Sequence, residues 1–302
     1  MNGKEVLEGY NLAIILCGIA AGTIARFVTI RIDARQVPSY PNAYLIHLVT
    51  GFIASALGSV AVPALLAKDF TAFTFLALAV QHFREVRKQE QESLETLESA
   101  EMAERGEGYI DGIAKTYESR NYISLLTALG TVSVLTAMGL KQIAANLALA
   151  AAIGTILIWL LVRFTSGKRI GDLCDLSLGK IEVKDGSLYV DGIYVTNQLG
   201  TEKAQKLFRE EGVSVVVKPR MEKHRVIVEQ AGQRKAMMFD AARSFGVKQY
   251  KFTEREMSDG RVVIAFVPIL PDPKGIMDAI RATPVLESGR KRRVGFEPKK
   301  GA

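Results

Sequence analysis

The sequence has little cysteine and none of the short motifs that mark common catalytic centres. Its two cysteines, Cys17 and Cys174, lie far apart, one in an apolar stretch and one in a polar region, so no disulfide framework is expected. No phosphate-binding Gly-Lys-Ser/Thr loop, Gly-x-Ser-x-Gly, His-Glu-x-x-His or Cys-x-x-Cys segment occurs. These absences indicate a reducing compartment and predict neither a bound metal nor a cofactor.

Acidic residues and lysines are missing from five apolar stretches, at 11–30, 44–67, 70–83, 122–140 and 142–162. A helix needs about 20 residues to cross the hydrocarbon of a bilayer, and four of the stretches reach that length. The third has only 14 residues. We predict a polytopic α-helical membrane domain of about five transmembrane helices, of which the third is the shortest.

The missing carboxylates and lysines remove the usual signature of an ion-coupled transporter. Small residues such as Gly18 and Gly22, and the hydroxyl groups along 122–140, are typical of closely packed membrane helices. We expect bundle packing from them, with a small-molecule channel or carrier as the less favoured reading. His47 and His82 are expected near the inner face, in structural roles.

The basic residues predict an orientation. Arginines and lysines follow the first, third and fifth stretches, whereas the opposite connections hold only Lys68 and Lys141. Because positive residues accumulate on the cytosolic side, the N-terminus is expected outside and the C-terminal domain in the cytosol. Residues 1–165 carry 13 Lys+Arg and 14 Asp+Glu, and the remainder carries 26 and 18. The basic half is therefore expected to be attracted to anionic lipid headgroups.

The internal connection 84–121 is acidic, with 6 Lys+Arg and 10 Asp+Glu. Its first part, 84–104, contains no Pro or Gly and is rich in helix-forming residues. We predict a cytosolic helical arm that continues the third stretch and is ended by Gly106 and Gly108.

A more specific segment follows the arm at 109–122. Ile110, Ile113, Ala114 and Tyr117 have the spacing of an apolar helical stripe, and Asp111 and Glu118 fall on another face. The pattern predicts an amphipathic helix at the inner membrane interface, leading into the fourth crossing. It is either a membrane-surface connector or a docking surface for a protein partner.

The segment Tyr109-Ile110-Asp111-Gly112-Ile113-Ala114 resembles the signature of the YIEGIA family, membrane proteins of endospore-forming bacteria, with Asp111 in place of glutamate. Residues 232–236 and 281–288 look like further family segments, so the resemblance extends over most of the chain. It implies a role in sporulation, in the bacterial cell membrane or a forespore membrane of the spore envelope. It implies no catalytic residue.

After residue 169 the sequence changes to short alternating runs. Strands are predicted at 180–185, 187–196, 213–218, 225–230, 247–253 and 261–269, and helices at 201–211, 233–245 and 275–282. This order predicts a small cytosolic α+β domain at 166–287 after the membrane domain of residues 1–165. Residues 288–302 are expected to form a basic, disordered tail that contacts anionic lipid rather than nucleic acid.

We therefore predict a non-enzymatic, sporulation-linked membrane anchor or scaffold. It would recruit a protein partner at the inner membrane face through its amphipathic helix and its α+β domain. The partner-binding residues are predicted to be Tyr109, Ile110, Asp111, Gly112, Ile113, Ala114, Glu118, Arg120 and Asn121.

The alternative function is a membrane-bound protease that processes another spore membrane protein with carboxylates. Aspartic proteases pair two carboxylates that share a proton and present them in Asp-Thr/Ser-Gly turns. Here Asp185 and Asp191 are each followed directly by glycine, and Asp172 and Asp175 lie outside such turns. His224, flanked by Lys223 and Arg225, is expected to be exposed, which argues against a His-based triad.

Overall fold

The computed structural model describes residues 9–33, 43–68, 70–139, 143–165 and 167–287. The predicted basic tail, 288–302, lies outside these residues. The chain divides into two compact units, which we call the helical unit (Met1–Ser93 with Ile113–Ser166) and the α+β unit (Leu94–Gly112 with Gly167–Ala302). The segment 94–112, which includes the end of the predicted arm, belongs to the α+β unit.

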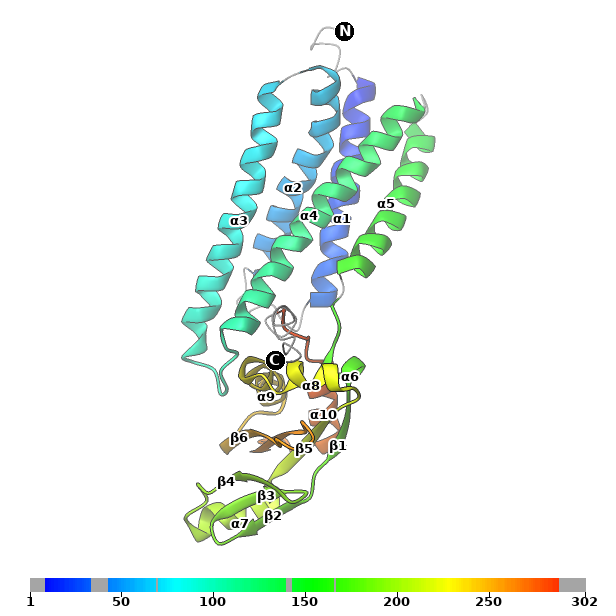
Figure 1. Ribbon diagram of the computed structural model, residues 1–302. Coiled ribbons are helices and arrows are strands. Elements are labelled where there is room, and N and C mark those ends of the chain that lie inside the picture. The colour runs from blue at the N-terminus through cyan, green and yellow to red at the C-terminus, as the bar shows by residue number, and fades with distance from the viewer. Residues whose placement is uncertain (1–8, 34–42, 69, 140–142, 166, 288–302) are drawn as a thin grey trace, which may run out of the picture. The chain divides into compact units, whose positions relative to one another are not determined.

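Five long helices account for the N-terminal half (Figure 1): α1 (Gly9–Asp33), α2 (Ala43–Leu66), α3 (Phe70–Glu98), α4 (Glu107–Met138) and α5 (Ile143–Thr165). Within the described residues, four segments are long and apolar enough to cross a membrane: Leu12–Ile30, Tyr44–Leu66, Glu107–Met138 and Ala145–Thr165. The apolar part of α3 is too short to join them, because its second half carries the charged residues of the arm. The coarse prediction of a helical membrane domain agrees with this arrangement.

Glycines bring α1, α2 and α4 into close contact. A Cβ added at Gly22 would lie 2.5 Å from the Ser55 hydroxyl, and one at Gly58 would lie 2.3 Å from the Leu125 carbonyl oxygen of α4. The buried Ser55 hydroxyl beside Gly22 donates to the Gly51 carbonyl of its own helix at 2.7 Å. These contacts are those of ordinary bundle packing, as predicted.

The arm is helical but ends earlier than predicted. α3 stops at Glu98, and Gly106, at φ +81°, lies in the turn before α4. Gly108 was predicted to help to end the arm, but it lies inside the first turn of α4. The carboxylate of Glu98, the last residue of α3, accepts a hydrogen bond from the Gly106 amide at 2.9 Å and so joins the end of the helix to this turn.

The strands of the α+β unit form two antiparallel sheets. The first has the order β1 (Cys174–Leu178), β5 (Val213–Pro219), β7 (Val262–Val267), β6 (Gln249–Arg255), and the second is the meander β2 (Ile181–Lys184), β3 (Ser187–Val190), β4 (Ile193–Thr196). The helices are α6 (Ile170–Leu173), α7 (Glu202–Glu211), α8 (Glu222–Val228), α9 (Ala231–Phe245) and α10 (Pro273–Ala282). The predicted α+β class is confirmed in these coarse terms.

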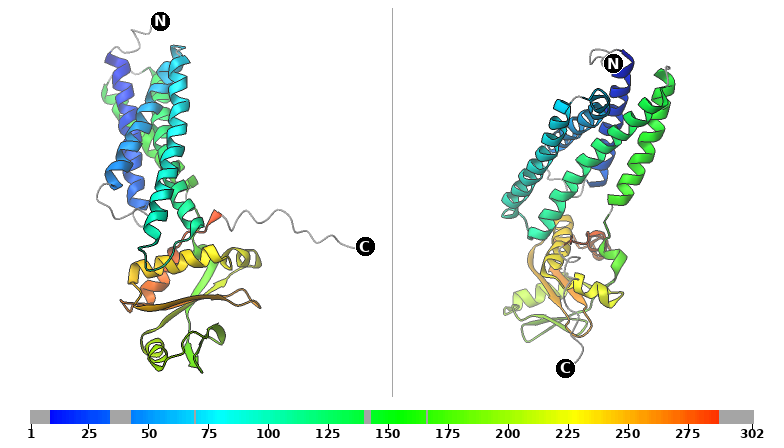
Figure 2. Two further views of the ribbon diagram at one scale, coloured as in Figure 1. Left: turned by 90° about the vertical axis from the view of Figure 1, so that its left-hand side faces the viewer. Right: turned by 45° about the horizontal axis from the view of Figure 1, so that its top comes forward.

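The four-stranded sheet has a hydrophobic core on each face. Figure 2 shows α9 and the meander on opposite sides of this sheet. Side chains of α6, α8, α9 and α10 cover one face, and Ala103 from the segment after α3 joins that core. The meander and Phe208 of α7 cover the other face. Every residue of β7 is buried, as expected for an interior strand of a sheet covered on both sides.

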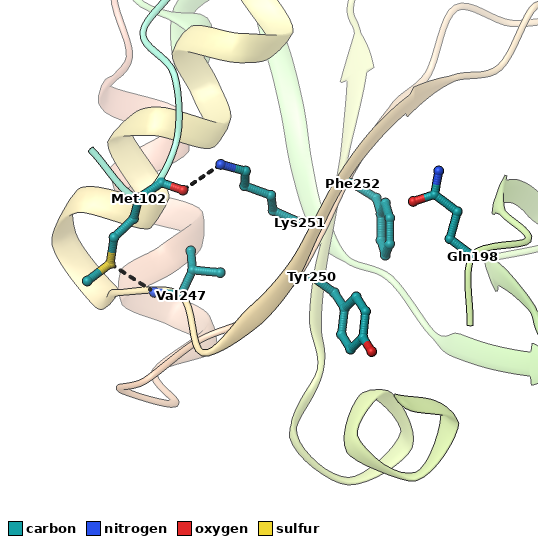
Figure 3. A pocket seen from close by; sticks show the side chains of 6 residues that line it. All are labelled: Met102, Gln198, Val247, Tyr250, Lys251 and Phe252. Atoms are coloured by element: carbon teal, nitrogen blue, oxygen red, sulfur yellow. Dashed lines mark hydrogen bonds between the residues drawn. The ribbon is translucent and has the colours of Figure 1, made fainter. Parts of the chain in front are cut away.

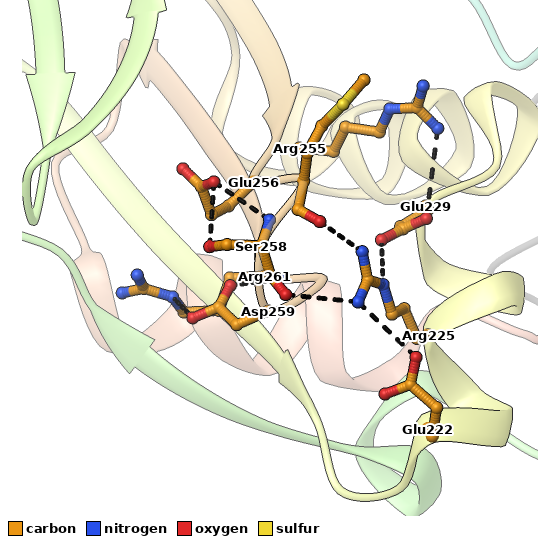
Figure 4. A network of polar contacts seen from close by, with 9 residues as sticks. Glu222, Arg225, Glu229, Arg255, Glu256, Ser258, Asp259 and Arg261 are labelled. Carbon is orange, nitrogen blue, oxygen red and sulfur yellow. Dashed lines mark hydrogen bonds and ion pairs between the residues drawn. The ribbon is translucent and has the colours of Figure 1, made fainter.

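Residues 225–230 were predicted as a strand, and this was wrong. Residues 225–228 form the second half of α8, where Val228 is buried and Val226 is exposed. The Arg225 guanidinium fastens this helix to the turn between β6 and β7 by donating to the carbonyls of Met257 and Ser258 (Figure 4). Glu229 pairs with Arg225 at 2.6 Å. These tertiary contacts override the strand preference of the β-branched residues.

Candidate functional site

The predicted site lies in the first four turns of α4, which is one continuous helix through the motif and the apolar stretch. The apolar stripe is buried along its whole length: Ile110, Ile113, Ala114 and Tyr117 are each 2% exposed or less. Asp111, Gly112 and Glu118 are half-buried. The boundary between the two units falls within the motif, after Gly112. The two halves of the motif therefore belong to different units.

The first half packs inside the α+β unit. The Tyr109 hydroxyl donates a 2.8 Å hydrogen bond to the Asp240 carboxylate of α9, and its ring meets the edge of Phe239 at 5.9 Å. The Arg105 guanidinium lies 4.4 Å from the centre of the Phe239 ring, a cation–π contact. These contacts hold the start of α4 against α9.

The segment just before the motif is held by ion pairs and backbone bonds of the same unit. Lys235 of α9 pairs with Glu104 at 2.6 Å, and this hydrogen bond lowers the pKa of Glu104. Lys251 of β6 donates to the Met102 carbonyl. Arg105 is buried and pairs with Glu98 and Glu101. The end of the predicted arm is thus an integral part of the α+β unit.

The second half of the motif packs inside the helical unit. Tyr117 stacks on His47 of α2 with ring centres 4.5 Å apart, and Glu118 pairs with Arg87 of α3 at 3.2 Å. Arg120 is buried and donates to the Thr165 hydroxyl of α5 at 3.0 Å. Asn121 is 1% exposed, and its side-chain oxygen has no hydrogen-bond partner among the described residues.

The structure also reveals polar residues that the sequence did not identify as part of a site. Arg26 was read only as a basic residue flanking the first stretch, yet it is 1% exposed inside α1. Glu90 of the predicted solvated arm is 6% exposed, and His47 is 2% exposed, whereas His82 is exposed. The sequence did hold one sign of a buried arginine, because Arg26 lies inside the apolar stretch 11–30, four residues before its end.

The four aspartates considered for a protease have local structural roles. Asp185 and Asp191 both have φ of +48° and precede glycines with positive φ, so they form the hairpin turns of the meander. The Asp172 carboxylate accepts from the Arg169 amide, and Asp175 pairs with Arg220 at 2.9 Å. His224 was predicted to be exposed and is buried, because its Nδ1 bonds to the Leu173 carbonyl at 2.9 Å.

One shallow pocket of about 420 Å³ lies beside β6 in the α+β unit (Figure 3). Its lining consists of Met102, Gln198, Val247, Tyr250, Lys251 and Phe252. Tyr250 has φ of +60° at a register shift of β6, and its ring stacks against Phe252. The Lys251 ammonium is already bonded to Met102. In the described part of the chain, no three His, Cys, Asp or Glu side chains are placed to hold a metal ion.

Comparison with known proteins identifies the motif's family. The family model described as "YIEGIA protein" matches residues 14–295. This chain belongs to the YIEGIA family. It is also similar to the Bacillus subtilis (strain 168) protein YphB, with 34% identity over 282 residues that cover 91% of this chain and 92% of YphB. No solved structure matches this YIEGIA protein.

Proposed function

We propose that this YIEGIA protein is a sporulation-linked membrane anchor whose helices hold the α+β unit at the cytosolic face, where it recruits a protein partner. The observation that carries the proposal is the division of the motif. Tyr109 and Ile110 are buried residues of the α+β unit, whereas Ile113, Ala114 and Tyr117 are buried residues of the helical unit. One uninterrupted helix thus belongs to both units, as an anchor-to-domain joint requires.

The membrane and sporulation parts of the proposal have separate support. Four helices of the described residues are long and apolar enough to span a bilayer. The relative YphB comes from Bacillus subtilis, an endospore former. The compartment we propose is the bacterial cell membrane or a forespore membrane.

For the topology, we propose five crossings, with the N-terminus outside and the α+β unit in the cytosol. Four crossings are the helices α1, α2, α4 and α5, and the fifth is the apolar start of α3. If α3 also crosses, the Arg and Lys clusters after the first, third and fifth stretches all lie on one side of the membrane. The basic tail would add attraction to anionic headgroups.

Partner recognition at the motif would use its half-buried members. Asp111, Gly112 and Glu118 retain exposed surface, whereas the other six predicted residues are buried. We propose that a protein partner contacts this polar side of α4 together with the surface of the α+β unit.

The test is capture of crosslinked partners from sporulating cells that express the full chain. Asp111→Ala should lose a partner that the unchanged chain retains, because it removes a charge from the proposed contact face. Glu92→Ala is the control, since Glu92 is an exposed carboxylate of α3 outside the motif. Equal capture by the unchanged chain and Asp111→Ala, or no sporulation-dependent partner, would refute the proposal.

A further inference from the structure

Three ionisable side chains from three helices meet in the interior of the helical unit. Arg26 of α1 donates from its Nε to the His47 carbonyl of α2 at 3.1 Å. The Arg26 guanidinium also acts electrostatically on both His47 and Glu90 of α3. Tyr117 of α4 closes the group by stacking on His47. All four side chains are 6% exposed or less.

The backbone is built to admit the arginine. A Cβ at Gly51 of α2 would lie 2.4 Å from the Arg26 side chain, so only glycine leaves room for its aliphatic stem. An arginine in a membrane helix is expensive unless it is paired or has a function. Its burial here depends on both the Gly51 gap and the His47 carbonyl.

The cluster contains polar atoms whose hydrogen-bonding capacity is not filled within the described residues. Glu90 Oε2, His47 Nε2 and the Asn121 side-chain oxygen are buried without a hydrogen-bond partner there. Such atoms are costly and call for an explanation by an additional ligand or by chemistry. Asn121 lies one turn after Tyr117 on α4, on the side of the helix that faces His47.

The chemistry of the cluster favours a proton as its ligand over a metal cation. The Arg26 guanidinium is permanently charged, so its positive charge disfavours the binding of a metal cation beside Glu90. The carboxylate and the imidazole are both groups that gain or lose a proton in the ordinary pH range. Two further cations lie close by in the sequence: Arg87 of α3, which pairs with Glu118, and Arg120 of α4, which donates to the Thr165 hydroxyl.

We propose that Arg26, His47 and Glu90 form a proton-binding site in the helical unit, with Glu90 as the group that takes up and releases the proton. In the protonated state, Glu90 is a neutral, buried carboxylic acid. On release of the proton to solvent, it becomes a carboxylate held by the Arg26 guanidinium.

The environment of Glu90, which lies beyond the apolar part of α3, supports this assignment. Burial raises the pKa of Glu90, and the Arg26 guanidinium opposes that rise. A group whose pKa is raised on folding makes the folded state more stable at low pH, and this stability is lost as the pH rises through the folded pKa. The fold is therefore expected to weaken as Glu90 ionises.

The test is the pH dependence of the apparent melting temperature of the full-length protein in detergent, from about pH 5 to about pH 9. The unchanged protein should lose stability with rising pH, and Glu90→Gln should lose that dependence because it mimics the protonated side chain. Glu92→Gln, an exposed carboxylate on the same helix, should keep the unchanged profile. Arg26→Gln should move the midpoint to higher pH, because the cation that favours ionised Glu90 is gone.

A second measurement does not depend on the folding of any variant. In the unchanged protein, infrared spectroscopy should show the carbonyl band of a protonated carboxylic acid at pH values where exposed carboxylates are ionised. Identical pH profiles for the unchanged protein and Glu90→Gln would overturn the proposal. Absence of the infrared band over the whole range would overturn it as well.

Discussion

At the residue scale, the YIDGIA motif owes its composition to packing in two places. Tyr109 uses both its hydroxyl and its ring against α9. Replacing it with Phe should destabilise the α+β unit by about 1–3 kcal/mol, since the hydrogen bond to a charged acceptor is lost. Hydrogen–deuterium exchange at α9 in the full chain measures this change. Tyr194→Phe is the control because Tyr194 is half-exposed, and an equal change in both variants would contradict the role assigned to Tyr109.

Two glycines, Gly58 of α2 and Gly112 of α4, should respond in opposite ways to the same added methyl group. Gly58→Ala forces a Cβ against the Leu125 carbonyl and should cost about 1–3 kcal/mol through overpacking. Gly112→Ala meets no atom within 4 Å and should stabilise α4 by roughly 0.5–1 kcal/mol through helix propensity. Melting temperatures in detergent compare the two variants. Equal effects would mean that α2 and α4 are not in close contact.

Cys174 should be almost unreactive in the folded protein. Burial raises the pKa of its thiol to about 12, so the reactive thiolate is scarce at neutral pH and increases only as the pH approaches that value. In a Cys17→Ser variant, alkylation at about pH 8 should be slow before denaturation and fast after it. Rapid alkylation of the folded protein would show that the start of β1 is open.

The buried polar residues show where sequence reasoning at this scale reaches its limit. The sequence around Arg26 predicts a charge that flanks a membrane helix, and the sequence around Glu90 predicts a solvated helical arm. Arg26 becomes interior through the contact between α1 and α2, where Gly51 leaves room for its side chain. Helix spacing within one segment carries no such information.

At the element scale, periodicity predicted the long helices and most strands because their apolar patterns are extended. The short elements were harder to predict. The strand β1 has only five residues and no clear alternation, and it was missed. The helix α8 has the composition of a strand and is held by Arg225 to a distant turn, a contact that no local pattern contains. The apolar stripe of the motif was predicted correctly as helical, and its burial follows from packing in both units.

The apolar start of α3 is the shortest of the proposed crossings, and cysteine labelling tests whether it spans the membrane. In a variant without native cysteines, cysteine at Lys68 should react with an impermeant maleimide from outside intact cells. Cysteine at Ser99, which is exposed in the turn after α3, should react only after permeabilisation. The two sites lie on either side of the helix, so the same accessibility at both would contradict a crossing by α3.

At the scale of the whole molecule, the chain combines a bundle packed through glycines with a sheet covered on both faces. The two units share α4. The chain passes from the helical unit into the α+β unit at Leu94 and re-enters the helical unit at Ile113. The sequence predicted the two kinds of structure. It did not predict that the arm's end belongs to the α+β unit, because the contacts of Lys235 and Lys251 join residues more than a hundred positions apart.

We propose that membrane helices present the α+β unit to the cytosol. Protease protection in sealed vesicles of known orientation tests it most directly. In inverted vesicles the protease should digest the α+β unit and leave a protected helical fragment, whereas in right-side-out vesicles that unit should remain intact. Digestion of the α+β unit in right-side-out vesicles, or release of the whole chain by an alkaline wash, would contradict the account.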